Sequence, residues 1–334
     1  MRKYNVAVVG ATGMVGRKFL EVLAERKLPV ENYYLFASAR SAGKKVEFMG
    51  KEYIIEELTN TCFDGKKIDI ALFSAGGSTS EKFAPAAVAA GAVVIDNSSA
   101  WRMDKKVPLI VPEVNSQEIS WNTGIIANPN CSTIQAVVAL KPLDDKYKIK
   151  RVVYSTYQAV SGAGMGGYSD LENGISGDAP KKFPHPIFGN CLPQIDVFDE
   201  DDYTKEELKM IYETRKILKN DEMRITATTV RVPVFHGHSE SINVEFEKDF
   251  DLTELKQALA NFPGIILMDD VSKGEYPMPL TVAGKDEVYI GRIRRDKSVK
   301  SGVNLWVVAD NIRKGAATNA VQIAQKWIEM QENK

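Results

Sequence analysis

Cys131 is the residue whose type and position offer the most direct chemistry, and it stands in the segment N-P-N-C-S-T-I-Q. Pro129 ends an apolar run, and an apolar helical pattern over residues 134–140 follows, so the cysteine is expected at the amino end of a helix. There the helix dipole and unsatisfied amides stabilise a thiolate and lower the pKa of the thiol from about 8.5. A lone cysteine is more often a small buried hydrophobe. The expected place at the carboxyl end of a strand, where α/β proteins bind ligands, instead favours a nucleophile that attacks acyl carbons.

A thiol nucleophile needs a proton-transfer partner, and the chain has three histidines. His185 lies in the proline-flanked segment F-P-H-P, whereas His236 and His238 lie in R-V-P-V-F-H-G-H-S. Because Gly237 interrupts the strand there, either of these two histidines could face a cleft, and the spacing leaves the choice open. An imidazole with a pKa near 6.5 can accept and return a proton. The H-x-H spacing could also indicate a metal, but no third ligand of metal type is nearby, so no metal site is expected.

A glycine-rich loop, G-A-T-G-M-V-G, follows the apolar run over residues 5–10 and opens a helical pattern. Gly10 allows a tight turn, Gly13 lets backbone amides approach a phosphate, and Gly16 permits close packing of helix on sheet. The alternative is a purely structural turn. The loop follows the first strand of a pattern in which strands and helices alternate. This position favours dinucleotide binding at the amino end of the helix. Cofactor contacts are expected from Gly10, Ala11, Thr12, Gly13, Met14, Val15 and Gly16.

The segment after the second strand indicates which dinucleotide is used. An NAD enzyme typically carries an acidic residue there, which accepts the ribose hydroxyls. Here the sequence is S-A-R-S-A-G-K-K, which contains no acidic residue. Arg40, with Ser38 and Ser41, can hold a 2′-phosphate through charge-assisted hydrogen bonds, so NADP is expected rather than NAD. The alternative is an ordinary solvated basic loop.

The pattern of predicted strands and helices indicates two domains with different types of sheet. Short apolar runs at 33–38, 68–74, 92–98 and 124–129 resemble buried parallel strands, with a helix over 79–90 and a hairpin over 45–55. From residue 149 onward, longer strands with alternating polarity predict a mixed or antiparallel sheet with one solvent-exposed face. Two helices interrupt these strands, one beginning at Thr204 with a capping-box Glu207 and one near Asp251.

We therefore expect a Rossmann-type doubly wound α/β sheet plus an α+β catalytic and dimerisation domain with a mixed sheet. The expected boundaries are 1–130 for the dinucleotide-binding domain and 131–311 for the catalytic domain. A final helix over 312–330 would pack back on the first domain. Its apolar face carries Ala317, Val321, Ala324 and Ile328.

Composition narrows the class of protein. A chain of 334 residues with 44% hydrophobic and 26% charged residues is typical of a globular protein with two domains. A net charge of -1 provides no overall positive potential that would attract nucleic acid or an anionic membrane. Cys62, Cys131 and Cys191 are few and widely spaced, as in a reduced cytosolic enzyme. Because no apolar stretch approaches a signal peptide or a membrane span, a cytoplasmic location is expected.

Seven separated motifs together resemble one known family. They are GATGMVG, SARSAG, NSSAWRMD, NPNCST, QAVSGAG, RVPVFHGHSES and DNIRKGAATNAVQ. Over essentially the whole chain they are similar to aspartate-semialdehyde dehydrogenases, particularly the bacterial forms. The resemblance implies reductive dephosphorylation of L-aspartyl 4-phosphate by NADPH, through a cysteine thioester, to L-aspartate 4-semialdehyde, phosphate and NADP. The reaction would serve the biosynthesis of lysine and diaminopimelate, threonine, methionine and isoleucine. The family also implies a homodimer or homotetramer assembled through the second domain.

The resemblance assigns roles residue by residue. It places the nucleophile on Cys131, the acid/base histidine on His238 and the substrate-orienting glutamine on Gln158. The substrate-binding residues that it implies are Arg231 for the α-carboxylate, Arg102 for the phosphate, and the pair Glu206 and Lys209. Further cofactor contacts that it implies are Ser74, Ser161, Gly162 and Asn311.

Two alternatives remain open at this point. The first is a related acyl-phosphate or acyl-CoA reductase such as N-acetyl-gamma-glutamyl-phosphate reductase. The second is a non-catalytic NADP-binding regulatory protein, which would lack the cysteine, the histidine or the glutamine.

Overall fold

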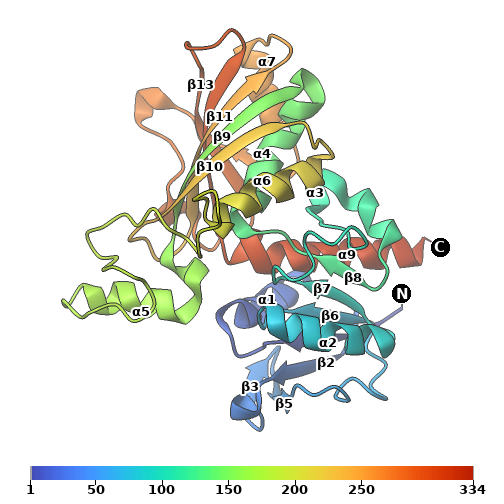
Figure 1. Cartoon of the computed structure of the whole chain (residues 1–334). Helices are drawn as coiled ribbons and strands as arrows, with labels where there is room; N and C mark the ends of the chain where they lie inside the picture. The colour runs from blue at the N-terminus through green and yellow to red at the C-terminus, as the bar shows by residue number, and fades with distance from the viewer. Residues whose placement is uncertain (1, 334) are drawn as a thin grey trace. The chain divides into compact units, whose positions relative to one another are not determined.

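The computed structural model describes residues 2–333, which fold into two compact units (Figure 1). Unit 1 contains the chain up to Pro129 together with the segment from Ala316 onward, and unit 2 runs from Asn130 to Gly315. No helix within residues 2–333 is long and apolar enough to cross a membrane.

Unit 1 is built on a six-stranded parallel sheet in the order β5-β2-β1-β6-β7-β8. The strands are β1 (Tyr4–Val9), β2 (Val30–Ala37), β5 (Glu56–Glu57), β6 (Ile70–Phe73), β7 (Val93–Asp96) and β8 (Ile125–Ala127). Every residue of β6 and β7 is buried, which explains why these strands appear in the sequence as unbroken apolar runs. The strand order reverses between β1 and β6, so the carboxyl ends of these strands form the topological switch point. The expected doubly wound sheet is confirmed.

Helices and one hairpin complete unit 1. The helices are α1 (Met14–Arg26), α2 (Gly77–Ala89), α3 (Pro112–Asn115) and α9 (Thr318–Glu332), with short 3-10 helices η1 (Ala39–Ser41) and η2 (Ser116–Trp121). The hairpin predicted over 45–55 is present as β3 (Lys45–Phe48) and β4 (Lys51–Ile54).

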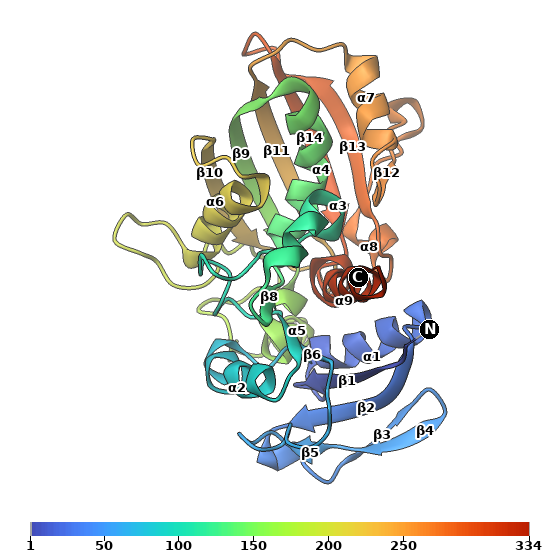
Figure 2. The same ribbon diagram turned by 90° about the vertical axis from the view of Figure 1, so that its right-hand side faces the viewer.

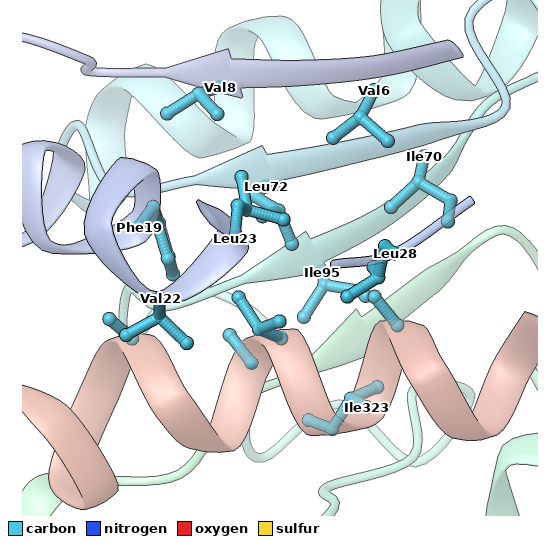
Figure 3. Close-up of a cluster of buried hydrophobic side chains, with 14 of the residues drawn as sticks. Val6, Val8, Phe19, Val22, Leu23, Leu28, Ile70, Leu72, Ile95 and Ile323 are labelled. Atoms are coloured by element: carbon cyan, nitrogen blue, oxygen red, sulfur yellow. The ribbon is translucent and has the colours of Figure 1, made fainter. Parts of the chain in front are cut away.

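The core of unit 1 is formed by residues from both the amino-terminal and the carboxyl-terminal parts of the chain. Side chains of α1, such as Phe19 and Leu23, meet Val8 of β1 and Ile323 of α9 in one buried cluster (Figure 3). The four residues predicted for the apolar face of the last helix are all buried. The α-helix begins at Thr318, later than expected, because residues 313–317 form a π-helical segment.

Unit 2 is built on a mixed six-stranded sheet in the order β10-β9-β11-β14-β13-β12. Its strands are β9 (Ile149–Gln158), β10 (Arg224–Arg231), β11 (His238–Phe246), β12 (Ile265–Leu267), β13 (Val288–Arg295) and β14 (Gly302–Ala309). The pairs β9/β10 and β12/β13 are parallel and the other pairs are antiparallel, as expected for a mixed sheet. Helices α4 (Cys131–Tyr147), α6 (Lys205–Leu218) and α7 (Leu252–Ala260) pack on it (Figure 2). The capping box of Thr204 and Glu207 begins α6 as predicted.

Some short elements of unit 2 are absent from the sequence-based prediction. They are α5 (Gly164–Gly174), α8 (Pro279–Val282), the strand β12, and the 3-10 turns η3 (Val160–Ala163) and η4 (Val271–Lys273). Glycine-rich α5 has a low intrinsic helix propensity, so its sequence does not predict a helix. Tertiary contacts stabilise it, because Leu171 packs in a small core with Val160 and Ile187, and Asp170 accepts backbone hydrogen bonds from residues 181–183.

Candidate active site

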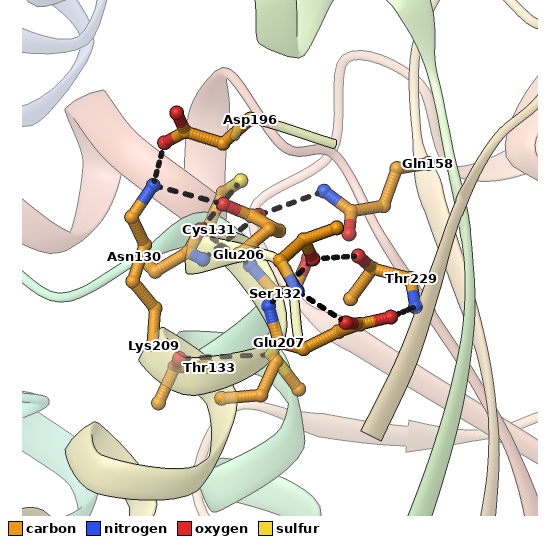
Figure 4. Close-up of polar contacts among 12 residues, drawn as sticks. Asn130, Cys131, Ser132, Thr133, Gln158, Asp196, Glu206, Glu207, Lys209 and Thr229 are labelled. Carbon is orange, nitrogen blue, oxygen red and sulfur yellow. Dashed lines mark hydrogen bonds and ion pairs between the residues drawn. The ribbon is translucent and has the colours of Figure 1, made fainter. Parts of the chain in front are cut away.

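Cys131 is the first residue of α4 and is half-buried. Asn130 is the N-cap, and its side-chain oxygen accepts from the backbone N–H of Ser132. The same Oδ1 accepts the thiol hydrogen of Cys131, with Sγ at 3.2 Å. The prediction that the sulfur stands at a helix amino end is therefore confirmed, and the cap residue fixes its orientation (Figure 4).

Two carboxylates of α6 hold Asn130 in place. Glu213 Oε2 accepts its backbone N–H at 2.7 Å, and Glu206 Oε1 accepts its Nδ2–H at 2.8 Å. Both glutamates are buried. Sequence analysis assigned no role to Asn130 or Glu213. The available signal was an asparagine at the N-cap position directly before the cysteine, whereas nothing in the sequence connects Glu213 with residue 130.

Glu206 is the centre of a polar network that includes the predicted glutamine and lysine. Gln158 Nε2 donates to Glu206 Oε1 at 3.0 Å, and Lys209 Nζ lies 3.1 Å from Oε2 (Figure 4). Burial alone would raise the pKa of Glu206, but Lys209, Asn130, Gln158 and Arg231 lower it to about 2. The carboxylate is therefore ionised at neutral pH, and it fixes the side chains around Cys131.

Lys209 bridges two carboxylates. Besides Glu206 it contacts Asp196 Oδ2 at 3.1 Å, and its side chain is 25% exposed. Burial tends to lower the pKa of Lys209, yet the two carboxylates raise it above its ordinary value. The sequence predicted the Glu206–Lys209 pair from the resemblance alone, and it gave no indication of Asp196.

Arg231 ends β10 as a buried cation. Its Nη1 donates to the backbone oxygen of Ala159 at 2.7 Å, and Nε has no hydrogen-bond partner among residues 2–333. Burial lowers the pKa of Arg231, whereas negative charge on Glu206 and on Cys131 raises it. The guanidinium therefore lies in the same electrostatic environment as the nucleophile and has an unused donor.

His238 begins β11 and is fully buried. Its Nδ1 accepts the backbone N–H of Ala159 at 2.9 Å, and its Nε2 has no partner within the described part of the chain. Burial and then the positive charge of Arg231 lower the pKa of His238 to about 3, so the ring is neutral at physiological pH.

Gly162 marks the space that these two donors share. A Cβ atom placed on this glycine would lie 2.9 Å from Arg231 Nη1 and 3.2 Å from His238 Nε2. Only glycine leaves that space open. Asn311 supports both flanking loops, since its Nδ2 donates to Ser161 Oγ at 3.1 Å and its Oδ1 accepts from Gly237 N at 2.9 Å.

The structure separates the three histidines. His236 packs against the ring of Tyr168, with centroids 5.7 Å apart, and His185 is exposed in a loop. Of the three, His238 interacts with Arg231 and Glu206, and Arg231 in turn interacts with Cys131. Within residues 2–333 no group of three or more His, Cys, Asp or Glu side chains is arranged to hold a metal ion.

Glu240, two residues after His238 on β11, is a further carboxyl group that the sequence did not predict. It is fully buried, and neither side-chain oxygen has a partner within residues 2–333. Burial and then the charge of Glu206 raise its pKa well above the ordinary value. Burial therefore favours the protonated form of Glu240, and the same face of the sheet carries buried Tyr154.

The Glu240→Gln variant should remove a pH-dependent term that lowers the free energy of unfolding of the parent protein. Below about pH 3 the carboxyl is protonated in both the folded and unfolded states, so it contributes no difference. Above its unfolded pKa only the unfolded state releases the proton, and each further pH unit lowers the stability of the folded state by up to about 1.4 kcal/mol. The urea midpoint of the variant should therefore rise relative to that of the parent as the pH increases above about 5. A gap independent of pH would mean that Glu240 is ionised in the fold.

Unit 1 contains the predicted cofactor loop. Gly10 follows β1 with φ +85°, and a Cβ there would lie 2.3 Å from the backbone oxygen of Ser74, which follows β6. Gly13 is the N-cap of α1, and no side chain caps that helix. Arg40 is exposed in η1, whereas Ser41 is buried and accepts from Thr12 Oγ1 at 3.5 Å.

The predicted phosphate-binding arginine also belongs to unit 1. Arg102 is 8% exposed. Its Nε donates to the backbone oxygen of Asn128 at 2.9 Å and its Nη2 to that of Asn97 at 3.0 Å. These acceptors follow β8 and β7, so the guanidinium is held at the carboxyl edge of the parallel sheet.

Two family models match the chain. The model described as semialdehyde dehydrogenase, NAD binding domain, matches residues 5–122, and the model described as semialdehyde dehydrogenase, dimerisation domain, matches residues 140–314. An aspartate-semialdehyde dehydrogenase of Aquifex aeolicus is 59% identical over 331 residues, which cover 96% of this chain and 97% of that protein. The chain belongs to the aspartate-semialdehyde dehydrogenase family.

Solved structures of aspartate-semialdehyde dehydrogenases share this architecture. That of the Vibrio cholerae enzyme II, complexed with ASA, is 47% identical with a TM-score of 0.94, covering 98% of this chain and 99% of that one. That of the Candida albicans enzyme with NADP is 26% identical with a TM-score of 0.78, covering 97% and 98%. As a member of the aspartate-semialdehyde dehydrogenase family, the chain is an oxidoreductase of amino-acid biosynthesis with an NAD(P)-binding domain.

Proposed function

We propose that the enzyme catalyses the NADPH-dependent reductive dephosphorylation of L-aspartyl 4-phosphate to L-aspartate 4-semialdehyde, with Cys131 as the covalent nucleophile. The product would feed the biosynthesis of lysine and diaminopimelate, threonine, methionine and isoleucine. The observation that carries the proposal is a pair of buried side-chain nitrogens without a partner among the described residues, Arg231 Nε and His238 Nε2, of which Arg231 interacts with the charge of Cys131. A small substrate with a carboxylate and an acyl oxygen satisfies both.

The residues around Cys131 support an acyl-transfer mechanism. The helix amino end stabilises the thiolate, which attacks the acyl carbon and expels phosphate to leave a thioester. Arg231 binds the α-carboxylate through its planar guanidinium. Gln158, held by Glu206, orients the substrate. Arg102 and the Glu206–Lys209 pair are proposed to bind the phosphate, on the basis of the family resemblance.

The cofactor loop fits NADP. The amides at the start of α1 have no side-chain cap, so they can bind the pyrophosphate, and Gly10 gives the backbone the turn that this approach needs. Ser38, Arg40 and Ser41 would hold the 2′-phosphate. We place Ser161, Gly162 and Asn311 near the nicotinamide. When bound, NADPH supplies the hydride that reduces the thioester carbon.

Arg40→Ala should change the choice of cofactor. Loss of a charged hydrogen-bond donor of about 1.5–3 kcal/mol should raise the KM for NADPH roughly 10- to 100-fold and leave that for NADH almost unchanged. Steady-state kinetics with both cofactors measure this, and the neighbouring Lys44→Ala variant is the matched control. Equal effects on NADPH and NADH would remove Arg40 from the 2′-phosphate site.

We further propose that unit 2 assembles the chain into a homodimer, which can pair into a homotetramer. The face of its sheet that bears Tyr157 and Trp306 exposes apolar side chains, including Tyr276 and Met278. The rings of Tyr157 and Trp306 contact each other there, with centroids 5.5 Å apart and planes tilted by 48°. The match to a dimerisation domain over residues 140–314 supports this assignment.

The assay that tests the proposed function runs in the phosphorolytic direction. Aspartate semialdehyde, phosphate and NADP should yield NADPH, and omission of phosphate should stop turnover. The rival N-acetyl-gamma-glutamyl-phosphate reductase activity is tested with N-acetylglutamate semialdehyde under the same conditions. Faster turnover of that compound would overturn the proposal.

A further inference from the structure

We infer that Asp196 competes with phosphate for Lys209 and thereby limits the affinity of the enzyme for phosphate. Asp196 belongs to the loop that precedes α6, the helix that carries Lys209. The inference rests on the proposed function, because it concerns the lysine that we assign to the phosphate. It starts from the two carboxylates that Lys209 contacts.

The two carboxylates differ in their exposure to solvent. Glu206 Oε2 and Asp196 Oδ2 both lie 3.1 Å from Lys209 Nζ, but the side chain of Glu206 is 8% exposed and that of Asp196 is 39% exposed. Glu206 also accepts hydrogen bonds from Asn130 and Gln158. Separation of a buried ion pair leaves an uncompensated buried charge, whereas an exposed ion pair contributes little to stability. Glu206 is therefore the permanent partner of Lys209, and Asp196 is the partner that an incoming anion can replace.

Lys209 offers phosphate fewer hydrogen-bond donors while it contacts Asp196. An ammonium group has three N–H donors. The contacts with Glu206 and Asp196 use two of them. The lysine side chain is 25% exposed, so an anion from solvent can reach it. A phosphate ion that binds through two donors of Lys209 must therefore replace Asp196.

Backbone contacts keep the Asp196 carboxylate close to Lys209. Asp196 has φ +74°, a left-handed conformation that is uncommon for residues other than glycine and persists only where the surrounding structure fixes it. Its Oδ1 accepts the backbone N–H of Val197 at 2.9 Å, and Val197 O accepts the backbone N–H of Lys205 at 2.9 Å. Lys205 is the first residue of α6, and Ile195 on the other side of Asp196 is buried. The carboxylate therefore remains near Lys209 after phosphate has replaced it.

The charge of Asp196 acts in the same direction as the competition for donors. Two carboxylates and one ammonium give the group of Glu206, Asp196 and Lys209 a net negative charge, and phosphate is itself an anion. Repulsion between like charges a few ångströms apart is weakened by solvent and salt but not removed. Asp196 thus favours release of the phosphate that leaves in the proposed reaction, before this phosphate can attack the thioester again.

Replacement of Asp196 by a neutral residue tests the inference. Asp196→Asn keeps an oxygen acceptor in a residue that tolerates the left-handed backbone, and Asp196→Gly relaxes that backbone. In both variants the KM for phosphate in the phosphorolytic assay should fall by about 3- to 10-fold. The KM values for aspartate semialdehyde and NADP should stay within about twofold of the parent values. A KM for phosphate that is unchanged or raised in the two variants would overturn the inference.

Asp202→Asn is the matched control. Asp202 lies in the same loop, is exposed and has φ +62°. The substitution removes the same charge from the same kind of backbone, but the ion-pair partners of Lys209 within residues 2–333 are Glu206 and Asp196. The KM for phosphate should therefore stay at the parent value.

The dependence on salt separates an effect of charge from a change of structure. Because salt screens the repulsion, the ratio of the phosphate KM values of the parent and Asp196→Asn should fall by at least about half between roughly 0.05 M and 0.5 M KCl. A ratio that does not change with salt would contradict the electrostatic role of Asp196.

Lys209→Ala separates failure of the inference from failure of the proposed function. This variant should raise the KM for phosphate by at least about tenfold, because it removes a charged donor. An unchanged KM would refute the assignment of phosphate to Lys209, and the inference with it. A raised KM in Lys209→Ala, together with parent values in Asp196→Asn and Asp196→Gly, would refute the role of Asp196 alone. If N-acetylglutamate semialdehyde is the better substrate, the proposed substrate is wrong, and the same comparison with that compound still decides the role of Asp196.

Discussion

Cys131→Ser should lower turnover of aspartate semialdehyde by more than roughly three orders of magnitude. A serine hydroxyl at the start of α4 keeps the hydrogen bond to Asn130 but does not ionise near neutral pH, so it cannot form the acyl intermediate at a useful rate. Cofactor binding should remain within about twofold, because the proposed NADP site uses other residues. NADPH formation in the phosphorolytic assay and fluorescence titration with NADPH measure the two quantities.

Cys191→Ser is the matched control for this prediction. Cys191 is an exposed cysteine of the same unit, and its substitution should leave kcat and KM unchanged. Turnover in Cys131→Ser above about 1% of the parent rate would rule out the covalent route.

Arg231→Leu should weaken the use of carboxylated substrate most strongly. The variant removes a buried cation that we assign to the α-carboxylate, so kcat/KM for aspartate semialdehyde should fall by about 10²- to 10⁴-fold, equivalent to about 3–5 kcal/mol. The KM for phosphate and for NADP should change little, since neither is assigned to this guanidinium. Arg231→Lys retains a charge without the planar fork and should give an intermediate loss.

Arg224→Leu is the control on the same strand. Arg224 lies at the other end of β10, is largely exposed and stands 3.8 Å from Glu245, so its loss should be kinetically silent. If Arg231→Leu raised the KM values of semialdehyde and phosphate equally, Arg231 would be a general electrostatic residue and not the carboxylate site.

Local signals in the sequence predict much of the fold correctly. The G-A-T-G-M-V-G loop after a fully apolar run specifies the β1–turn–α1 unit, and the Thr204 and Glu207 pair begins α6 as a capping box. The four apolar positions predicted for the last helix are spaced for one face, and all four are buried. In each case the interactions that determine the structure are between residues close in the sequence, so the residue types are sufficient to predict the element.

The residues that orient the site depend on contacts between distant segments. Asn130 and Glu213 are far apart in the sequence, and their 2.7 Å hydrogen bond exists only because α6 packs beside the start of α4. Glu240 lies in an alternating strand whose pattern does not show that a carboxyl is buried there. The resemblance identified His238, but only the Ala159 contact bears on which nitrogen holds its proton.

Trapping the acyl-enzyme is the most direct test of the central claim. Enzyme mixed with aspartate semialdehyde and NADP, without phosphate, should release one NADPH per active site in a rapid burst. After acid quench, peptide mass spectrometry should find the mass of one aspartyl group on the peptide that contains Cys131. A burst with that peptide unmodified, or with the acyl group on another residue, would contradict catalysis through a Cys131 thioester.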